Sequence, residues 1–201
     1  YTVRALLGTA EETGMEDVKY YLANYPAPLF AFSPDADFPV CNGEKGIYHA
    51  RVTARGSTGN IVELSGGIVI NAVPDTAEAL IKADIDALGS ADNIQTAAEN
   101  GLVRVTARGT AGHASHPEGT VNAIGVLTDY LLENGAAGAD EEKFLRLMRK
   151  LHSASDGSGL GVKAADDKFG ALTIIGGMAG ITDGHLWQTV DCRYPTTMTG
   201  E

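Results

Sequence analysis

The sequence predicts an α+β protein with two parts. From residue 43 onward, alternating β-branched segments punctuated by glycine predict a sheet. Two stretches of helical periodicity between these segments predict helices that cover one face of that sheet. The first 44 residues instead combine apolar runs with one helical stretch, which is typical of an α/β arrangement. We therefore expect a boundary between residues 1–44 and residues 45–201, with a mixed or antiparallel sheet in the second part.

The first part is expected to form a strand, a helix and a second strand, over Thr2–Leu7, Asp17–Asn24 and Ala27–Phe32. Carboxylates follow both strands, with Glu11 and Glu12 after the first and Asp35 after the second. In an open α/β sheet, ligands collect where strands end, because the connecting loops converge there. These two loops are therefore candidate ligand-binding positions.

The second part is expected to contain at least five strands, over Gly46–Arg55, Ile61–Ala72, Leu102–Arg108, Ala171–Ile175 and Leu186–Tyr194. Asp183 and Gly184 have the composition of a hairpin turn. Helical periodicity over Val121–Leu131 and Phe144–Leu151 predicts two helices, and Asp140 is the expected N-cap of the second. Thr76–Leu88 is ambiguous, because its composition favours a helix and its position after the segment at 71–74 suits a strand.

Composition excludes several kinds of partner. The chain has 15 Lys and Arg against 26 Asp and Glu, and its net charge of −11 disfavours nucleic acid through repulsion. No apolar run approaches the roughly 18 residues that a membrane span needs. Cys41 and Cys192 lie far apart without Cys-x-x-Cys spacing, so we expect reduced thiols. A small-molecule partner, no membrane association and a cytoplasmic location are the resulting expectations, although the chain begins at Tyr1 without an initiator Met.

Taken singly, the acidic positions carry little functional information. Glu11 and Glu12 precede a helix, where acidic side chains commonly complement the helix dipole. Asp35 follows Ser-Pro, which is ordinary turn chemistry. The order of short motifs is more informative: Gly-Thr-Ala-Glu-Glu-Thr-Gly at 8–14, Phe-Ser-Pro-Asp-Ala-Asp-Phe-Pro at 32–39, Gly-Glu-Lys-Gly at 43–46, Asn-Ala-Val-Pro-Asp at 71–75, Gly-His-Ala-Ser-His-Pro at 112–117 with Val-Asn-Ala at 121–123, and Asp-Cys-Arg-Tyr-Pro at 191–195.

This succession resembles the co-catalytic zinc metallopeptidases that include carboxypeptidase G, desuccinylases, aminoacylases and the PepV-like dipeptidases. The Asp-Ala-Asp-Phe-Pro stretch and the long insert after it resemble the last group. The resemblance spans nearly the whole chain. It implies a zinc dipeptidase in which residues 1–44 are a remnant of the α/β metal-binding catalytic domain and residues 45–201 are a lid domain, truncated at its C-terminal end. It also favours a strand over Thr76–Leu88.

The resemblance assigns the acidic residues to a reaction in which a water held between two metal ions attacks a peptide carbonyl. Glu11 resembles the general base that takes the proton of this water. Glu12 resembles a ligand of one zinc ion, and Asp35 resembles a ligand of the other. Asp37 is a competitor for the second position, but the family's ligand follows Ser-Pro directly, as Asp35 does. Cobalt or manganese could replace zinc.

Three residues of the second part resemble substrate-binding groups of the family's lid. His113 resembles the histidine that reaches the scissile carbonyl oxygen, and the Val-Asn-Ala that follows selects it over His116. Asn71 resembles a lid amide that helps to bind substrate. Arg193 resembles the arginine that grips the terminal carboxylate of the dipeptide, a task that suits the planar fork of donors on its side chain.

The sequence also departs from the family. The family's early His-x-Asp motif, a bridging Asp and a C-terminal histidine have no counterpart in the 201 residues, and none of the five histidines is followed two places on by Asp. Of the expected metal ligands, Glu12 and Asp35 are present. We therefore expect a central fragment that needs the remainder of its catalytic domain, and that by itself folds from about Gly46 onward but shows no peptidase activity and only weak zinc binding.

Two alternatives stay open. A related amidase, such as a desuccinylase or aminoacylase, would share the metal chemistry and differ in the acyl group that it recognises. A polypeptide that consists of a lid alone could serve as a binding or association module. A His-x-Asp motif encoded before Tyr1 would favour the enzyme, and its absence would favour the module. The preferred dipeptide and the oligomeric state are not decided by the sequence.

Overall fold

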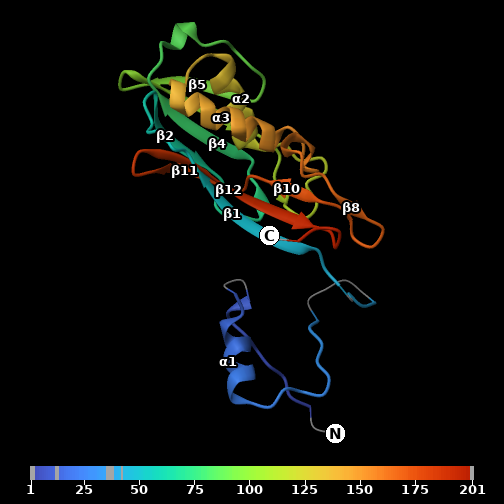
Figure 1. Cartoon of the computed structure of the whole chain (residues 1–201). Coiled ribbons are helices and arrows are strands. Elements are labelled where there is room, and N and C mark those ends of the chain that lie inside the picture. Colours follow the sequence, from blue (N-terminus) through green and yellow to red (C-terminus); the bar gives the residue numbers. More distant parts are fainter. Residues whose placement is uncertain (1–2, 12–13, 35–38, 42, 200–201) are drawn as a thin grey trace. The chain divides into compact units, whose positions relative to one another are not determined.

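The computed structural model describes residues 3–11, 14–34, 39–41 and 43–199. The chain divides into two compact units, residues 1–43 and residues 44–201 (Figure 1). Each unit is described by itself. No helix in the described residues is long and apolar enough to cross a membrane.

In the described part of the first unit, α1 (Glu16–Asn24) confirms the helix expected in this region. The Asp17 side chain accepts hydrogen bonds from the backbone N–H groups of Thr9 (2.7 Å) and Ala10 (3.1 Å), and so ties the preceding segment to the helix. The strands expected over 2–7 and 27–32 are not found in the described residues of these segments. A strand is stable only when its backbone pairs with a neighbour. Here the apolar side chains of both segments remain largely exposed, including Leu7, Leu29, Phe30 and Phe32.

The second unit is built on a sheet of eight strands in which every described pair is antiparallel, which confirms the α+β class. The strand order is β1-β12-β11-β2-β4-β6-β5, and β10 also pairs with β12. Short pairs β3–β7 and β8–β9 lie outside this sheet. The bounds are β1 (Gly46–Thr53), β2 (Ile61–Gly66), β3 (Ala72–Val73), β4 (Thr76–Ile81), β5 (Ile94–Glu99), β6 (Leu102–Arg108), β7 (Gly112–His113), β8 (Ala165–Asp166), β9 (Gly170–Ala171), β10 (Thr173–Ile175), β11 (Ala179–Thr182) and β12 (His185–Tyr194).

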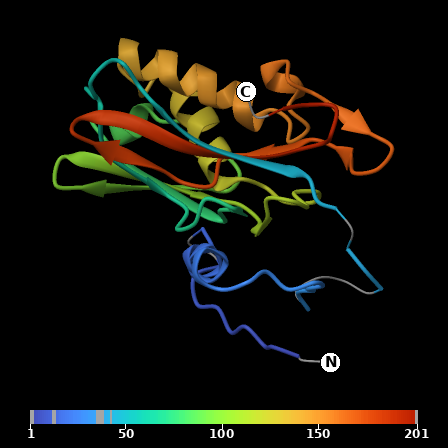
Figure 2. The same cartoon turned by 60° about the horizontal axis from the view of Figure 1, so that its bottom comes forward.

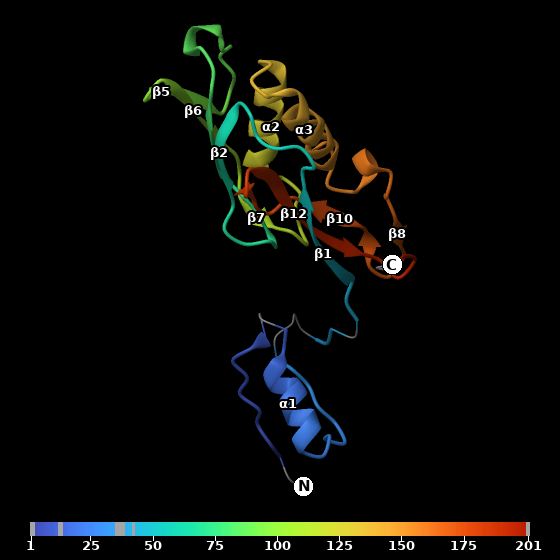
Figure 3. The same ribbon diagram turned by 60° about the vertical axis from the view of Figure 1, so that its left-hand side comes forward.

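Two helices, α2 (Ala123–Glu133) and α3 (Ala139–His152), cover one face of this sheet (Figures 2 and 3). Strand alternation creates the face that they cover, because every second side chain of β4 and β6 is apolar and buried. Short 3-10 turns, η2 (Ile85–Ala87) and η3 (Ser158–Leu160), complete the regular structure of this unit. The main core lies between the sheet and the helices and includes Ile81, Val105, Leu127, Leu131 and Phe144.

Most expected strands are confirmed, but the runs over 61–72 and 171–175 are each divided, the second into β9 and β10, and two strands of the eight-stranded sheet were not expected. The run over 61–72 does not continue as one strand, because β2 ends at Gly66 and Gly67 adopts a left-handed backbone (φ 67°). Thr76–Leu88 begins with β4, so the strand is confirmed against the helical composition. The sequence did not predict β5 or β11. Asp183 and Gly184 form the expected turn, both with positive φ (51° and 75°).

The helix caps differ from expectation in one case. Asn122 caps α2, where its side chain accepts the N–H of Ile124 (3.0 Å). The second helix begins before Asp140, which was the expected cap. Its N-cap is Gly138, and the Glu141 side chain reaches back to accept the Gly138 N–H (2.5 Å). Asp140 instead lies in the first turn and pairs with Lys143 (2.8 Å).

Candidate functional site

The two-stranded β3–β7 pair brings Asn71 and His113 together from positions 42 apart in the sequence. Ala72 pairs with His113, and the backbone N–H of Ala114 donates to the Asn71 carbonyl (3.0 Å). Val73, Ala114 and Ile175 form a small buried cluster beneath this pair. Two of the side chains that the sequence selects for substrate binding therefore emerge from neighbouring backbone positions.

A tight turn after β7 places Ser115 against the His113 ring. The N–H of His116 donates to the His113 carbonyl (3.1 Å), which closes the turn. Within this turn, both the backbone N–H and the hydroxyl oxygen of Ser115 lie within hydrogen-bonding distance of His113 Nδ1, at 3.2 Å and 2.7 Å. The same hydroxyl oxygen lies 2.8 Å from His116 Nδ1.

From these three contacts we infer where the hydrogens lie on the two rings in their neutral forms. A backbone N–H can only donate, so His113 Nδ1 accepts and carries no hydrogen. The Ser115 hydroxyl must then donate its hydrogen to the same nitrogen, and it is left to accept one from His116 Nδ1. Neutral His113 consequently carries its hydrogen on Nε2 and is a donor there. Neutral His116 carries its hydrogen on Nδ1 and has a bare, accepting Nε2.

Arg193 lies on β12 and is held by a buried carboxylate. Asp191 is fully buried and accepts two hydrogen bonds from Arg193, from Nε (2.7 Å) and from a terminal nitrogen (2.8 Å). His49 on β1 contacts the same carboxylate through Nε2 (2.8 Å). Sequence reasoning quoted Asp191 within a motif but assigned a role only to Arg193, and it passed over His49. Asp191 and Arg193 are two positions apart on one strand, so their side chains share a face of the sheet, and this spacing was the available signal for Asp191.

The strand that carries Arg193 is linked to the β3–β7 pair through β10. Thr173 and Ile175 on β10 pair with Arg193 and Asp191 on β12. Ile175 also belongs to the cluster that supports β3 and β7. The structure thus connects the segment of Arg193 to that of Asn71 and His113 through one packed side chain.

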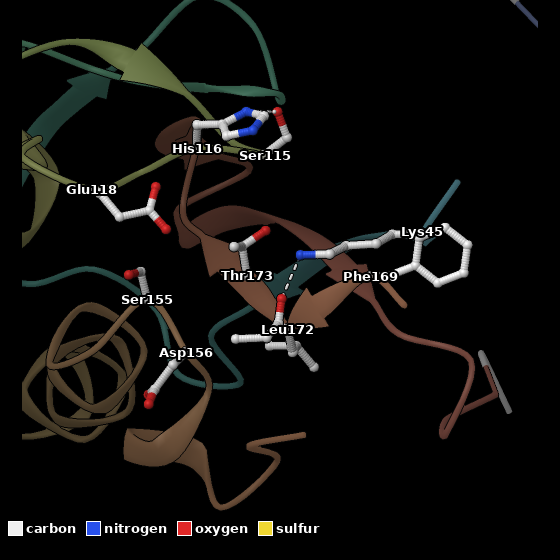
Figure 4. A pocket seen from close by; sticks show the side chains of 10 residues that line it. Lys45, Ser115, His116, Glu118, Ser155, Asp156, Phe169, Leu172 and Thr173 are labelled. Atoms are coloured by element: carbon white, nitrogen blue, oxygen red, sulfur yellow. Dashed lines mark hydrogen bonds between the residues drawn. The ribbon is translucent and has the colours of Figure 1, made fainter. Parts of the chain in front are cut away.

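A pocket of about 280 Å³ opens beside the His113 turn (Figure 4). Ser115 and His116 lie at one side of it, and Lys45 extends toward it from the opposite side. The Lys45 ammonium donates to the Ala171 carbonyl. The other lining residues are Glu118, Ser155, Asp156, Phe169, Ala171, Leu172 and Thr173.

The residues expected to hold metal lie largely outside the described part of the chain. Glu12, Asp35 and the competitor Asp37 are outside the described residues. Glu11 is described and exposed, and its carbonyl accepts the N–H of Gly14 (3.3 Å). Among the residues that the structure does describe, no three His, Cys, Asp or Glu side chains gather into a group that could hold a metal ion.

The second unit is an α+β domain with polar side chains gathered at the short β3–β7 pair. Similarity to known proteins indicates the class of protein that the chain resembles. No protein-family model matches the chain. The chain is 30% identical over 212 residues to the protein of Bacillus subtilis named "Putative dipeptidase YtjP", an alignment that covers 97% of this chain and 46% of the relative. It is also 30% identical over 187 residues to the Beta-Ala-Xaa dipeptidase of Lactobacillus delbrueckii subsp. lactis, covering 83% of this chain and 38% of that protein.

A similar relationship holds for a protein of Staphylococcus epidermidis whose name also assigns it to the dipeptidases, at 27% identity over 85% of this chain and 40% of the relative. The chain therefore spans less than half the length of the curated relatives that it matches. Across almost all of its own length, it is similar to proteins named as dipeptidases.

Proposed function

We propose that this chain is part of a zinc-dependent dipeptidase, in which residues 45–201 form the lid that binds the dipeptide. The observation that carries the proposal is the adjacency of Asn71, which directly precedes β3, and His113 on the paired strand β7. Its supports are the similarity to dipeptidases over nearly the whole chain and the presence of Arg193 on a strand linked to that pair.

His113 is proposed to donate a hydrogen bond to the carbonyl oxygen of the scissile peptide. Ser115 occupies Nδ1 with two hydrogen bonds, so the Nε2–H remains as the donor that this role needs. A fixed donor of this kind stabilises the negative charge that develops on the oxygen in the transition state. Asn71 would contribute a second polar contact from the position directly before β3.

Arg193 is proposed to bind the free carboxylate of the dipeptide. Its side chain is largely buried, at 15% exposure, and Asp191 fixes its plane through two hydrogen bonds. A guanidinium has five N–H donors, and these two bonds leave others for a ligand carboxylate. Asp191 also offsets part of the arginine charge, so binding depends on directed hydrogen bonds and less on net charge.

In this proposal Glu11 is the general base, Glu12 holds one zinc ion and Asp35 holds the other, with cobalt or manganese as possible replacements. When bound, such ions would activate the attacking water. The described residues supply no complete site for either ion. For the same reason we expect the 201-residue chain by itself to lack peptidase activity and to bind zinc only weakly.

The test is to express the complete gene product and assay a panel of dipeptides with zinc, cobalt and manganese. Hydrolysis is expected, and His113→Ala should lower kcat by roughly 10²-fold or more, the cost of losing one oxyanion donor. His185→Gln is the control, since the one hydrogen bond that the His185 side chain makes among the described residues is to the Gly56 carbonyl (3.2 Å). Absence of hydrolysis with all three metals, or equal loss in both variants, would refute the proposal.

A further inference from the structure

The pocket beside the His113 turn has hydrogen-bond acceptors on one wall. The Ser115 hydroxyl oxygen lies 2.8 Å from His116 Nδ1, and if Nδ1 of the neutral ring donates there, as inferred for the His113 turn, Nε2 carries no hydrogen and can accept. Glu118 lies two residues further on and lines the same pocket with a carboxylate (Figure 4). Both side chains are exposed, and Glu118 has no ion-pair partner among the described residues.

The opposite wall presents donors. The Lys45 ammonium donates one hydrogen bond to the Ala171 carbonyl, and its other two N–H donors are available to a ligand. Thr173 is only 6% exposed, and its hydroxyl has no hydrogen-bond partner among the described residues. A buried hydroxyl without a partner costs free energy, and native structures seldom leave one so. Figure 4 shows the Thr173 oxygen directed toward the space between His116 and Lys45.

The pocket also has one unpaired negative charge and one unpaired positive charge among its described lining residues. Asp156 lines it, but Lys163 pairs with this carboxylate (2.7 Å) and lowers the pKa of Asp156. Glu118 and Lys45 remain as the unpaired charges that face the space. A simple anion would meet Glu118, and a simple cation would meet Lys45, so neither matches both walls. At about 280 Å³, the pocket falls just below the roughly 300–1,000 Å³ of pockets that hold drug-sized ligands.

We propose that this pocket binds a small zwitterion, with its ammonium at His116 Nε2 and Glu118 and its carboxylate at Lys45 and the Thr173 hydroxyl. A free amino acid and a dipeptide both have these two ends. That the natural ligand is the substrate or product of a dipeptidase rests on the proposed function, but the binding itself does not. The buried Thr173 hydroxyl has no hydrogen-bond partner among the described residues, and this distinguishes the pocket from a surface hollow that binds no ligand.

The experiment is an NMR titration of the ¹⁵N-labelled 201-residue chain with alanine and with alanyl-alanine, each compared with its N-acetylated and C-amidated forms. Saturable shifts are expected at the backbone amides of Ser115, His116 and Thr173 with at least one uncapped probe. Either cap should weaken binding by about tenfold or more, because each removes a charge-assisted contact. Which uncapped probe binds more tightly distinguishes an amino-acid site from a dipeptide site.

Variants make the test specific. Thr173→Val, which preserves shape, and the exposed Glu118→Gln should each weaken binding by about tenfold, whereas Thr96→Val and Glu133→Gln, outside the pocket, should leave it unchanged. Absence of saturable shifts, equal binding of capped probes, or unchanged affinity in both pocket variants would overturn the inference. Failure of the complete protein to hydrolyse dipeptides would count against the proposed function and leave this binding result standing.

Discussion

Replacing Glu141 with Gln should destabilise the second unit strongly, although the side chain takes part in no described ion pair. Glu141 is 2% exposed, and its two oxygens accept four backbone N–H groups. One oxygen takes Gly59 (2.6 Å) and Ile61 (2.8 Å), and the other takes Asn60 (3.2 Å) and Gly138 (2.5 Å). This carboxylate therefore joins the start of β2 to the start of α3.

The magnitude follows from these four bonds. Glutamine keeps one acceptor oxygen, but its NH₂ group must face two N–H donors that previously shared the other oxygen. Hydrogen bonds to a charged group are worth about 1.5–3 kcal/mol each, and relief of the desolvation of the charge offsets part of the loss. We expect a loss of about 3 kcal/mol in the free energy of unfolding.

The assay is urea unfolding of the chain followed by the fluorescence of Trp187, the single tryptophan, which lies on β12 in the same unit. The matched control is Glu142→Gln at the next position. Glu142 is partly exposed and pairs with Arg146 four residues on (2.5 Å), a contact worth about 0.3–0.5 kcal/mol. Unfolding free energies within 1 kcal/mol of each other for the two variants, at unchanged urea dependence, would refute the reasoning.

Three further predictions follow from other parts of the second unit. Burial lowers the pKa of His152 from 6.5 to about 4. The neutral ring's contribution to the free energy of unfolding is therefore fully present above pH 6.5, and about 3 kcal/mol is lost as the pH falls toward 4. Urea midpoints should fall with pH across this range, and His152→Gln should reduce that slope. Gly101→Ala should cost about 1 kcal/mol from its left-handed backbone alone (φ 79°), whereas Gly67→Ala should cost clearly more in the same unfolding assay, since an added Cβ would also lie 1.9 Å from the Gly177 carbonyl oxygen. In the complete gene product, Arg193→Ala should raise KM for dipeptides with a free carboxylate, and equal rates on C-amidated dipeptides before mutation would contradict its role.

Local pattern was sufficient for the long strands and for both helices of the second unit, because their apolar periodicity matches the face that the core buries. Local pattern was not sufficient where pairing with a neighbouring strand determines the secondary structure. The sequence of β5, Ile-Gln-Thr-Ala-Ala-Glu, has weak strand propensity and forms a strand at the edge of the sheet beside β6. The Ala-rich β4 is a strand because β2 and β6 flank it, which overrides its helical composition.

The same limit explains the strands that were wrongly expected in the first unit. The apolar runs at 2–7 and 27–32 have strand-like composition, but the described residues of the first unit contain no strand that could pair with either run. Composition reports which residues suit a sheet, whereas formation of a strand requires a neighbour to take its N–H and C=O groups. In the second unit each long strand has such a neighbour, and there the expectations were confirmed.

At the candidate site, residue types could be selected from the sequence, but their chemical states could not. The Gly-His-Ala-Ser-His-Pro motif gives two histidines three positions apart, and nothing in that spacing distinguishes a donor ring from an acceptor ring. The distinction arises from the turn closed by His116 N–H and the His113 carbonyl, which lets Ser115 present two donors to one ring and an acceptor to the other. Opposite tautomers on neighbouring histidines are therefore a property of the folded turn. A free neutral imidazole favours the hydrogen on Nε2. In ¹⁵N spectra of the histidine rings, we therefore expect neutral His116 to carry its hydrogen on Nδ1, and to carry it on Nε2 in the variant Ser115→Ala. A hydrogen on Nε2 of His116 in the unaltered chain would exclude this arrangement.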